Sequence, residues 1–366
     1  MVFRNSIYIS VSLLLLAVLS LSACTADTLT DAEVQEEIDT YNIEGLTEEY
    51  IRNFDARIEA QKSRPDVIQN APYRHMIMAR PETKKTYLKY ISEMDISDIE
   101  KEKMTATFED IWERAPDNIT KNDYPKLEWL GTAIHKHIER HYLKNETLNT
   151  ERQTGEPNRW NAAPHQDFIY YGCLRVYSNT SFANNAKAHA NDPDADGFEP
   201  FGLRQYNHYY NPSLGIGGAP SRCYTFATYA QNNYSSGQLT VSSTNLGIAS
   251  HYISDVGNPM HTGQEWAQGL NSSIHSSYEA YVSGNWSSGH NYKDIVSSNT
   301  QSKTVTNPSN AVVSLATYSN SYLDILMEEI EINPTGYGSD IDVRFLTTRV
   351  ICETAKYNVG LADYVI

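Results

Sequence analysis

Five side chains of the kinds that bind metal ions follow one another in the second half of the chain, in the spacing H-x3-D-x5-H-x13-H-x3-E. They are His251, Asp255, His261, His275 and Glu279. The first two are four residues apart, as are the last two, so each pair would project from one face of an α-helix. A Gly-Asn-Pro run after Asp255 predicts the end of the first helix and puts His261 in the following turn. The pattern therefore requires two helices whose side chains converge.

The residue types in this pattern are suited to zinc. Imidazole nitrogen and carboxylate oxygen are common zinc ligands, and three protein ligands leave a position for water or substrate. One isolated His-x3-Asp pair on a helix is more often a surface ion pair. That explanation does not extend to five such residues around a helix stop, so the sequence predicts a metal site here. The cysteines at 173, 223 and 352 lack the spacing of a cysteine-based zinc site and allow at most one disulfide.

The rest of the second half also predicts helices. Helical periodicity is found at about 165–178, 221–235, 240–256, 272–283, 308–330 and 341–364. Gly and Pro gather in loops at 193–220, 257–259 and 333–338, and strand-like alternation is scarce. The expected fold class is therefore all-α, with residues 160–366 forming a multi-helix bundle.

The composition of the chain changes near residue 150. Residues 25–150 are dense in Glu, Lys, Asp and Arg, and a polar connector containing Gly and Pro follows at 151–159. Asp31 is expected to cap a first helix, and further helical patches are expected at 46–61, 100–114 and 126–143. Because 366 residues is long for a single hydrophobic core, we expect a separate helical N-terminal region before the bundle.

His135, His137 and His141 lie together in the last of these patches. His137 and His141 are four residues apart, which is the spacing of a pair that grips zinc from one helical face. No third ligand is evident beside them in the sequence. The preferred interpretation is therefore an exposed amphipathic helix.

The first residues are typical of an export signal. Arg4 supplies a positive charge, and the apolar run at 11–21 is too short for a comfortable stop-transfer helix. The run leads into the tetrapeptide LSAC, which resembles a lipoprotein processing site. We expect residues 1–24 to be a lipoprotein-type signal peptide, with Cys24 lipidated and attached to a membrane surface; an ordinary secretory signal is the alternative. The expected localisation is thus export, as a cell-surface lipoprotein or as a secreted protein after processing.

The segment from Leu246 to His261, LGIASHYISDVGNPMH, resembles the central metal motif of the bacterial zinc-dependent phospholipase C family. That family has the same helix, Pro-Met-His turn and second His-x3-Glu helix. The related single-strand nuclease branch usually has wider spacing before the last pair and ends it with Asp. The compact spacing and Glu279 favour the phospholipase branch, and the resemblance covers roughly residues 160–366.

The same resemblance implies further ligands upstream. The run NHYYNP is similar to a ligand segment of the family and makes His208 a ligand. Asp194 stands where the family has an aspartate that touches the metal and acts as base, with Asp196 as a close competitor. Trp160 and His165 resemble the family's amino-terminal Trp and the His ligand that follows it.

Members of the family hold three zinc ions, and the resemblance implies how this chain would hold them. The three ligand sets would be His251, His208, Asp194 and Asp255; Asp255 as a bridge with His165 and Trp160; and His261, His275 and Glu279. Asp194 would be the catalytic residue, positioning or deprotonating the water that attacks phosphorus.

Trp160 departs from the family pattern because it is internal to the chain. In the family the Trp is the mature amino terminus, and its free amine binds zinc, whereas the lone pair of an amide nitrogen is delocalised. One hypothesis is that residues 25–159 form a pro-region and that cleavage between Arg159 and Trp160 completes the third site. The alternative is that Trp160 packs at a domain junction.

The function expected from this resemblance is phosphodiester hydrolysis by a zinc-dependent enzyme, in the first place a phospholipase C acting on phospholipids. The enzyme alternative is a zinc-dependent single-strand nuclease or another phosphoesterase. A second alternative is a non-catalytic, zinc-binding surface lipoprotein. The net charge of −16 argues against a surface-wide basic groove for nucleic acid, so no nucleic-acid partner is expected except under the nuclease alternative.

Overall fold

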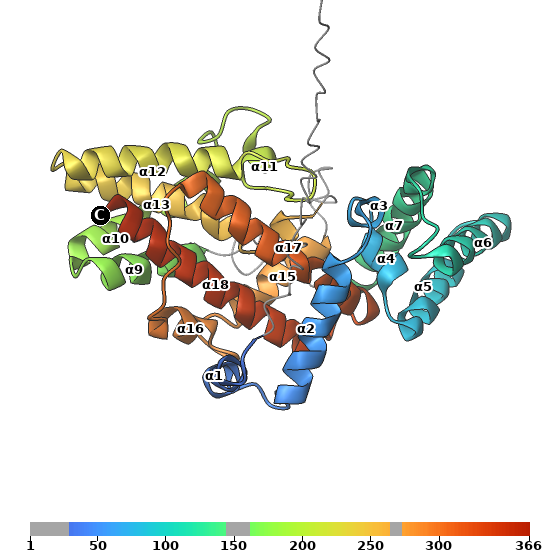
Figure 1. Cartoon of the computed structure of the whole chain (residues 1–366). Coiled ribbons are helices and arrows are strands. Elements are labelled where there is room, and N and C mark those ends of the chain that lie inside the picture. Colours follow the sequence, from blue (N-terminus) through green and yellow to red (C-terminus); the bar gives the residue numbers. More distant parts are fainter. Residues whose placement is uncertain (1–28, 144–161, 264–272) are drawn as a thin grey trace, which may run out of the picture.

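The computed structural model describes residues 29–143, 162–263 and 273–366, and every regular element in these ranges is a helix (Figure 1). The all-α fold class is therefore confirmed. The only β-type pairing in the described ranges is an isolated bridge between Asn211 and Ile216. Among the described helices, none combines the length and the apolar character that crossing a membrane demands.

The helices follow one another closely along the chain. Those of the first half are α1 (Asp31–Tyr41), α2 (Glu48–Lys62), α3 (Asp66–Gln69), α4 (Arg74–Met78), α5 (Pro81–Glu93), α6 (Asp98–Arg114), η1 (Lys121–Asp123), α7 (Tyr124–Ile138) and the π-helical turn η2 (Glu139–Leu143). The next are α9 (Ala162–Val176), α10 (Thr180–His189), η3 (Asp192–Asp194), α11 (Arg204–Asn207), α12 (Ala219–Ser235), α13 (Leu239–Asp255) and η4 (Pro259–His261). The last are α15 (Ser273–Gly284), α16 (Tyr292–Ser298), α17 (Pro308–Ile332), η5 (Tyr337–Ser339) and α18 (Ile341–Val365).

Capping side chains explain where several helices begin. Thr30 caps α1 by accepting a hydrogen bond from the backbone N–H of Glu33, whose carboxylate accepts one from the N–H of Thr30. Asp31, the expected cap, is the first residue of the helix instead. Ser97 and Glu100 form the same reciprocal pair at the start of α6.

Helix α13 lies at the centre of the second half of the molecule. Every residue from 246 to 255 is buried, which is typical of a helix packed on all sides. Helix α12 precedes it in the chain, is joined to it by a short turn at 236–238 and runs beside it (Figure 1). On another side α10 comes so close that a Cβ atom at Gly247 would lie 2.2 Å from the carbonyl oxygen of Ala186. Neighbouring helices therefore hold α13 firmly in place.

The hydrophobic core consists of two clusters that share the long helices α17 and α18. One cluster joins helices of the first half to α15, α16, the C-terminal part of α17 and the N-terminal part of α18. The other joins α9, α10, α12 and α13 to the opposite ends of the same two helices. In Figure 1, α17 (orange) and α18 (red) accordingly run between the N-terminal helices and α9–α13.

Charged pairs also connect the first half of the chain to α17 and α18. Arg349 on α18, which is 5% exposed, donates to Glu37 on α1 at 2.6 Å and contacts Asp55 on α2. Arg74 on α4 donates to Asp324 on α17 at 2.9 Å. Removing one partner of such a buried pair leaves an uncompensated charge, which is strongly destabilising.

Several sequence predictions fall on residues outside the described ranges. These are the signal peptide with Cys24, the connector at 151–159, the cleavage site after Arg159, and Trp160. Helices on both sides of the connector share one hydrophobic cluster. A chain cut between Arg159 and Trp160 would therefore remain associated through that cluster, and the N-terminal helices would not simply diffuse away.

The prediction that the histidines near residue 137 lie on an exposed helical face is wrong for two of them. His135 and His137 are 5% and 7% exposed, because α7 is packed between the other N-terminal helices and α17. Only His141, in the π-helical turn, is exposed. Cys173 and Cys223 are buried free thiols, and Cys352 is a half-buried one.

Candidate metal centre

The predicted ligands that the structure describes come from six places in the chain and meet in two adjacent groups. The first group contains His165 of α9, Asp194 of η3, His208 after α11, and His251 and Asp255 of α13. The second contains His261 of η4 and, from α15, His275 and Glu279. All of these except Asp194 are less than 9% exposed. Trp160 lies outside the described residues.

Asp255 is the centre of the first group. Its Oδ2 lies 2.9 Å from Nδ1 of His208 and 3.3 Å from Nε2 of His251. Its Oδ1 lies on the other side, 3.4 Å from Nε2 of His165. The two oxygens thus face different imidazoles, which is the orientation required of a carboxylate that bridges two cations.

The tautomer of His251 is set by a neighbouring helix. Its Nδ1–H donates to the carbonyl oxygen of Ala190, at the C-terminal end of α10, over 2.8 Å. The lone pair of Nε2 is then directed at Asp255 and at Nδ1 of His208, 3.0 Å away. A histidine whose second nitrogen donates to a backbone carbonyl is the usual arrangement at a metal.

Burial lowers the pKa of two imidazoles of this group, those of His165 and His251. Burial and the neighbouring charge of His251 lower the pKa of His165 to about 3, and the two rings stack with centroids 4.2 Å apart. Burial likewise lowers the pKa of His251. Burial alone would raise the pKa of Asp255, but the neighbouring imidazoles of His251 and His208 outweigh it and lower that pKa. A lowered pKa at His165 and His251 beside a lowered pKa at Asp255 favours neutral imidazoles and an ionised carboxylate, which metal binding requires.

The second group is built around one carboxylate oxygen. Oε1 of Glu279 lies 3.2 Å from Nε2 of His261 and 3.0 Å from Nε2 of His275. Asn258, just before the Pro-Met-His turn, donates to the same oxygen at 3.4 Å. Burial raises the pKa of Glu279, but the charge of His275 and hydrogen bonds from both histidines lower it to about 2.

In the metal-free second group, the surroundings of His261 favour a proton on its imidazole. Burial by itself lowers the pKa of His261, but its hydrogen bond to Glu279 and the charges of Asp255 and Glu279 raise it to about 9. A metal ion that binds here must displace that proton, so its affinity should rise with pH. The donor set of two imidazoles and one carboxylate fits zinc.

Backbone contacts tie the two groups together. Nδ1–H of His261 donates to the carbonyl oxygen of His208 over 2.8 Å, and the N–H of Tyr210 donates to the carbonyl of His261 over 3.1 Å. The loop that carries His208 is itself fixed by Glu199, which accepts hydrogen bonds from Asn207 at 2.6 Å and from Arg222 at 3.1 Å. A shift of this loop would therefore disturb both groups.

The structure distinguishes the two candidate aspartates. Asp194 lies with the first group, its Oδ2 3.9 Å from Nε2 of His251, and its side chain is 22% exposed. The side chain of Asp196 is fully exposed and points to Arg204 at 3.4 Å. Burial raises the pKa of Asp194, but the charge of His251 outweighs it and lowers that pKa. Asp194 is therefore an ionised carboxylate at the rim of the group, partly open to solvent.

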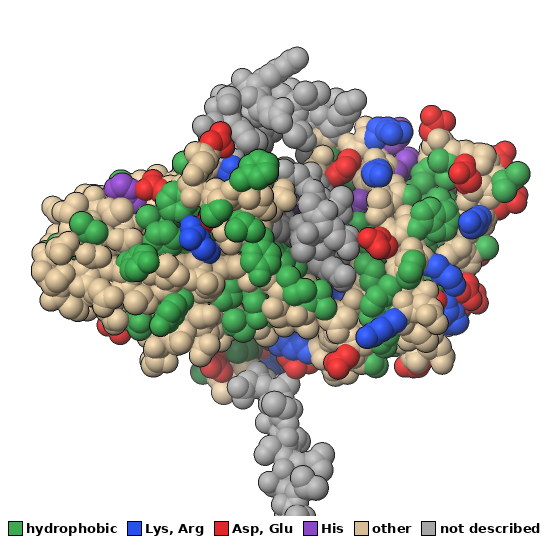
Figure 2. Space-filling model, turned by 90° about the horizontal axis from the view of Figure 1, so that it is seen from above, with side chains coloured by type: hydrophobic (Ala, Val, Ile, Leu, Met, Phe, Trp, Pro, Cys, Tyr) green, Lys and Arg blue, Asp and Glu red, His purple; other side chains and the backbone are tan. Residues whose placement is uncertain are grey.

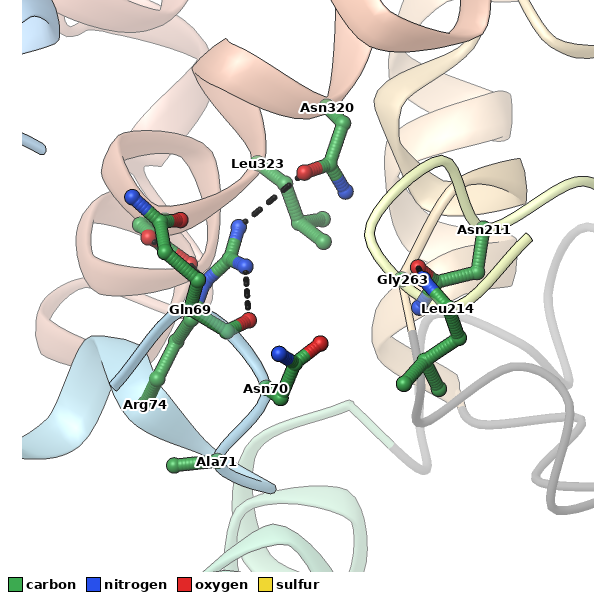
Figure 3. Close-up of a pocket in the computed structure, with 10 residues that line it drawn as sticks. Gln69, Asn70, Ala71, Arg74, Asn211, Leu214, Gly263, Asn320 and Leu323 are labelled. Carbon is green, nitrogen blue, oxygen red and sulfur yellow. Dashed lines mark hydrogen bonds and ion pairs between the residues drawn. The ribbon is translucent and has the colours of Figure 1, made fainter. Parts of the chain in front are cut away.

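A pocket beside the second group is shared with the N-terminal helices (Figure 3). It encloses about 290 Å³ of empty space including its mouth, and its walls include Asn70 and Arg74 on one side and Asn211 and Gly263 on the other. Arg74 donates to the carbonyl of Gln69 at 2.6 Å and to Oδ1 of Asn320 at 3.2 Å, as the dashed lines show.

This pocket wall supports the turn that carries His261. The side-chain amide of Asn320 on α17 donates to the carbonyl oxygen of Thr262 at 3.0 Å and to its hydroxyl at 3.2 Å. A line of hydrogen bonds thus runs from Arg74 through Asn320 to the residue after His261. Sequence reasoning missed both Arg74 and Asn320, because no local pattern marks residues that meet only in the folded chain.

Comparisons with known proteins add a distant likeness. No family model and no curated protein sequence matches the chain. Among solved structures it is similar to an alpha toxin from Clostridium absonum, with 17% identity and a TM-score of 0.40 over 55% of this chain and 62% of that one. It is also similar to the alpha-toxin of an avian strain of Clostridium perfringens, with 14% identity and a TM-score of 0.41 over 55% of this chain and 64% of that one. In each case the chain spans less than two thirds of the other protein.

Proposed function

We propose that the protein is a zinc-dependent phosphodiester hydrolase whose substrates are phospholipids. The observation that carries this proposal is the convergence of five histidines, two aspartates and one glutamate from separate parts of the chain into two adjacent groups, in which every member except Asp194 is buried. Lone pairs and ionised carboxylates packed against one another without solvent need cations between them. We propose that this centre holds three zinc ions, with Trp160 contributing to the third site.

Different residues of the chain would have different roles in such a reaction. Zinc ions bound here would supply Lewis acidity, which stabilises charge on phosphate oxygens and acidifies water. Asp255 and Glu279 orient and balance the imidazoles around them. Asp194 is ionised and partly exposed, so its carboxylate can orient the attacking water and accept its proton.

Exposed apolar side chains near the centre support a lipid substrate over a nucleic acid. The segment between η3 and α12, which also carries His208, and the first turns of α12 expose Phe201, Leu203, Tyr206, Leu214, Ile216 and Tyr224. Phe201 is completely exposed. In Figure 2, acidic and basic side chains gather on the right, over the N-terminal helices, whereas hydrophobic and uncharged side chains prevail on the left. Apolar side chains that rim a site are suited to insertion into a lipid surface.

Attachment at the membrane belongs to the same proposal. A lipid anchor at Cys24 would hold the exported chain at a bilayer, where phospholipids are concentrated. A polybasic groove, which a nuclease would use to track the phosphate backbone, is not expected from a net charge of −16.

The test is a substrate panel on the purified full chain. Phosphatidylcholine vesicles, single-stranded DNA and a chromogenic phosphodiester are assayed after chelation and after return of zinc. We expect zinc-dependent release of diacylglycerol from the vesicles, abolished by His251→Ala and retained by Asp196→Asn. Activity on DNA alone would establish the nuclease instead, and zinc binding without hydrolysis of any substrate would establish a non-catalytic protein.

A further inference from the structure

Three buried side chains lie together at the junction between the N-terminal helices and α17, away from the metal centre. They are His75 of α4, His135 of α7 and Glu331 of α17, which are 2%, 5% and 0% exposed. One donor atom from each lies within 4.8 Å of the other two. Since the residues are about 60 and 196 positions apart in the chain, only folding brings them together.

Both imidazoles face the same oxygen of the carboxylate. Nε2 of His75 lies 2.8 Å from Oε1 of Glu331, and Nε2 of His135 also contacts that oxygen. The other oxygen, Oε2, accepts a hydrogen bond from the hydroxyl of Tyr87 at 2.6 Å. The hydroxyl of Tyr90 donates to the backbone carbonyl of Glu331 at 2.7 Å. These two tyrosines hold the carboxylate so that Oε1 faces the histidines.

No arginine or lysine in the described part of the chain contacts Glu331. The two nearest arginines in sequence to His75 are committed to other acids, Arg74 to Asp324 and Arg80 to Glu328 and Glu329. A fully buried carboxylate without a compensating positive charge is strongly unfavourable. The positive charge must come either from a proton shared with the histidines or from a bound cation.

The packing around the histidines is unusual for an ordinary core. Tyr73 adopts a left-handed conformation with φ of 50°, which is rare for a bulky residue. Its ring fills the space over Gly131, where a Cβ atom would lie 2.1 Å from the ring. One turn further on, His135 meets the same ring edge to face, with centroids 4.8 Å apart. The Tyr73 ring thus packs against both Gly131 and His135 of α7, next to the three side chains.

The ring nitrogen of His135 that points away from Glu331 lies in a buried environment. Nδ1 of His135 is buried and has no hydrogen-bond partner in the described chain. A charged imidazolium would bury an N–H without an acceptor, which costs more than the neutral N–H that remains when Nε2 binds a metal. The competing arrangement places the proton on His75, with both rings donating to Glu331.

The donor set repeats that of the second group of the metal centre. There, two Nε2 atoms lie 3.2 and 3.0 Å from a single oxygen of Glu279. We propose that His75, His135 and Glu331 bind a further divalent metal ion, zinc by their chemistry, which clamps α4 and α7 to α17. The three protein donors leave one tetrahedral position for water. This site is structural and does not depend on the hydrolytic activity.

The test measures the zinc content of the full chain. Wild type and variants are stripped with chelator, reloaded with zinc and analysed by mass spectrometry of the metal. Glu331→Gln and His135→Gln should each contain one zinc ion fewer per chain than wild type. Gln at position 135 can still donate a hydrogen bond to Glu331, so this variant preserves the arrangement required by a shared proton. Glu328→Gln is the matched control, because this buried neighbour contacts Arg80 and Thr83 and neither histidine.

A result that overturns the proposal is easily recognised. Folded His135→Gln with the zinc content of wild type would show that the triad holds a proton and no metal. If both variants fail to fold, an anomalous difference map at the zinc edge from zinc-loaded wild-type crystals decides the question. A peak between the three side chains is expected, and an empty position there contradicts the proposal. Neither readout involves phosphodiester hydrolysis, so the result is separate from the test of the proposed function.

Discussion

Gly247→Ala should damage both the packing of α13 and the affinity of the metal centre. The added Cβ would lie 2.2 Å from the carbonyl oxygen of Ala186, whereas ordinary contacts begin at 3.4 Å, so α10 and α13 must separate by about 1.2 Å. One turn further along both helices, Nδ1 of His251 is bonded to Ala190 over 2.8 Å. That bond would stretch to about 4 Å, beyond hydrogen-bond range.

The expected magnitude follows from these two effects. Overpacking costs about 1–3 kcal/mol, and a buried hydrogen bond left unmade costs about 1–3 kcal/mol. Since the free energy of unfolding of typical domains is about 5–15 kcal/mol, a loss of about 2–6 kcal/mol should be measurable by urea denaturation of the metal-free protein. Loss of the partner that orients His251 should weaken zinc binding by about 10–100-fold.

A matched substitution separates this effect from that of glycine removal in general. Gly284→Ala, at the exposed end of α15, adds a Cβ that meets no atom within 4 Å, so its free energy of unfolding should change by less than about 0.5 kcal/mol. Zinc affinity is measured by competition with a chromogenic chelator. If Gly247→Ala matched wild type in both stability and zinc affinity, the close approach of α10 would not be what positions His251.

Three further predictions test the site and the fold. Asp194→Asn should lower the rate of hydrolysis by about 10²–10⁴-fold, whereas Asp196→Asn should change it little, as steady-state kinetics on a soluble phosphodiester would show; equal losses would contradict the assignment of the base. Phe201→Ser should leave thermal stability and soluble-substrate hydrolysis unchanged but weaken vesicle binding by about 30-fold, from roughly 2 kcal/mol of lost apolar burial, and unchanged co-sedimentation would argue against membrane insertion. Asp123→Asn should destabilise the protein by about 1–3 kcal/mol at pH 7, because hydrogen bonds from Arg114 and the Thr120 cap lower the pKa of Asp123 in the folded state. That contribution is present above the unfolded pKa near 3.8 and is lost as pH falls below it, so urea denaturation should show wild type and variant converging at low pH.

Much of the second half could be predicted because the signals in it are local. Periodicity marked α13 as 240–256 and α17 as 308–330, against observed bounds of Leu239–Asp255 and Pro308–Ile332. The His-x3-Asp and His-x3-Glu pairs lie one turn apart on single helices, so their convergence depends on few unknowns. Local spacing likewise explains why His261, in the turn after a Gly-x-Pro stop, was expected beside them.

The short helices and the burial of the N-terminal histidines were not predicted, because no local signal in the sequence marks them. Helices α3, α4 and α11 are only four or five residues long and carry too little periodicity to be seen. His135 and His137 were predicted to be exposed because α7 is rich in polar residues. In the structure, α4, α5 and α17 pack around them. Glu331, which contacts His135, lies 196 positions further along the chain.

The sequence by itself determined the helical class of this protein and the residues that meet as pairs on α13 and α15, because both depend on the 3.6-residue period of one helix. Only the tertiary structure decided that Asp194 and not Asp196 joins His251, that Arg74 and Asn320 support the turn of His261, and that His75, His135 and Glu331 share one buried position. The physical reason is that burial and long-range contacts depend on how helices pack against one another, and no window of neighbouring residues contains that information.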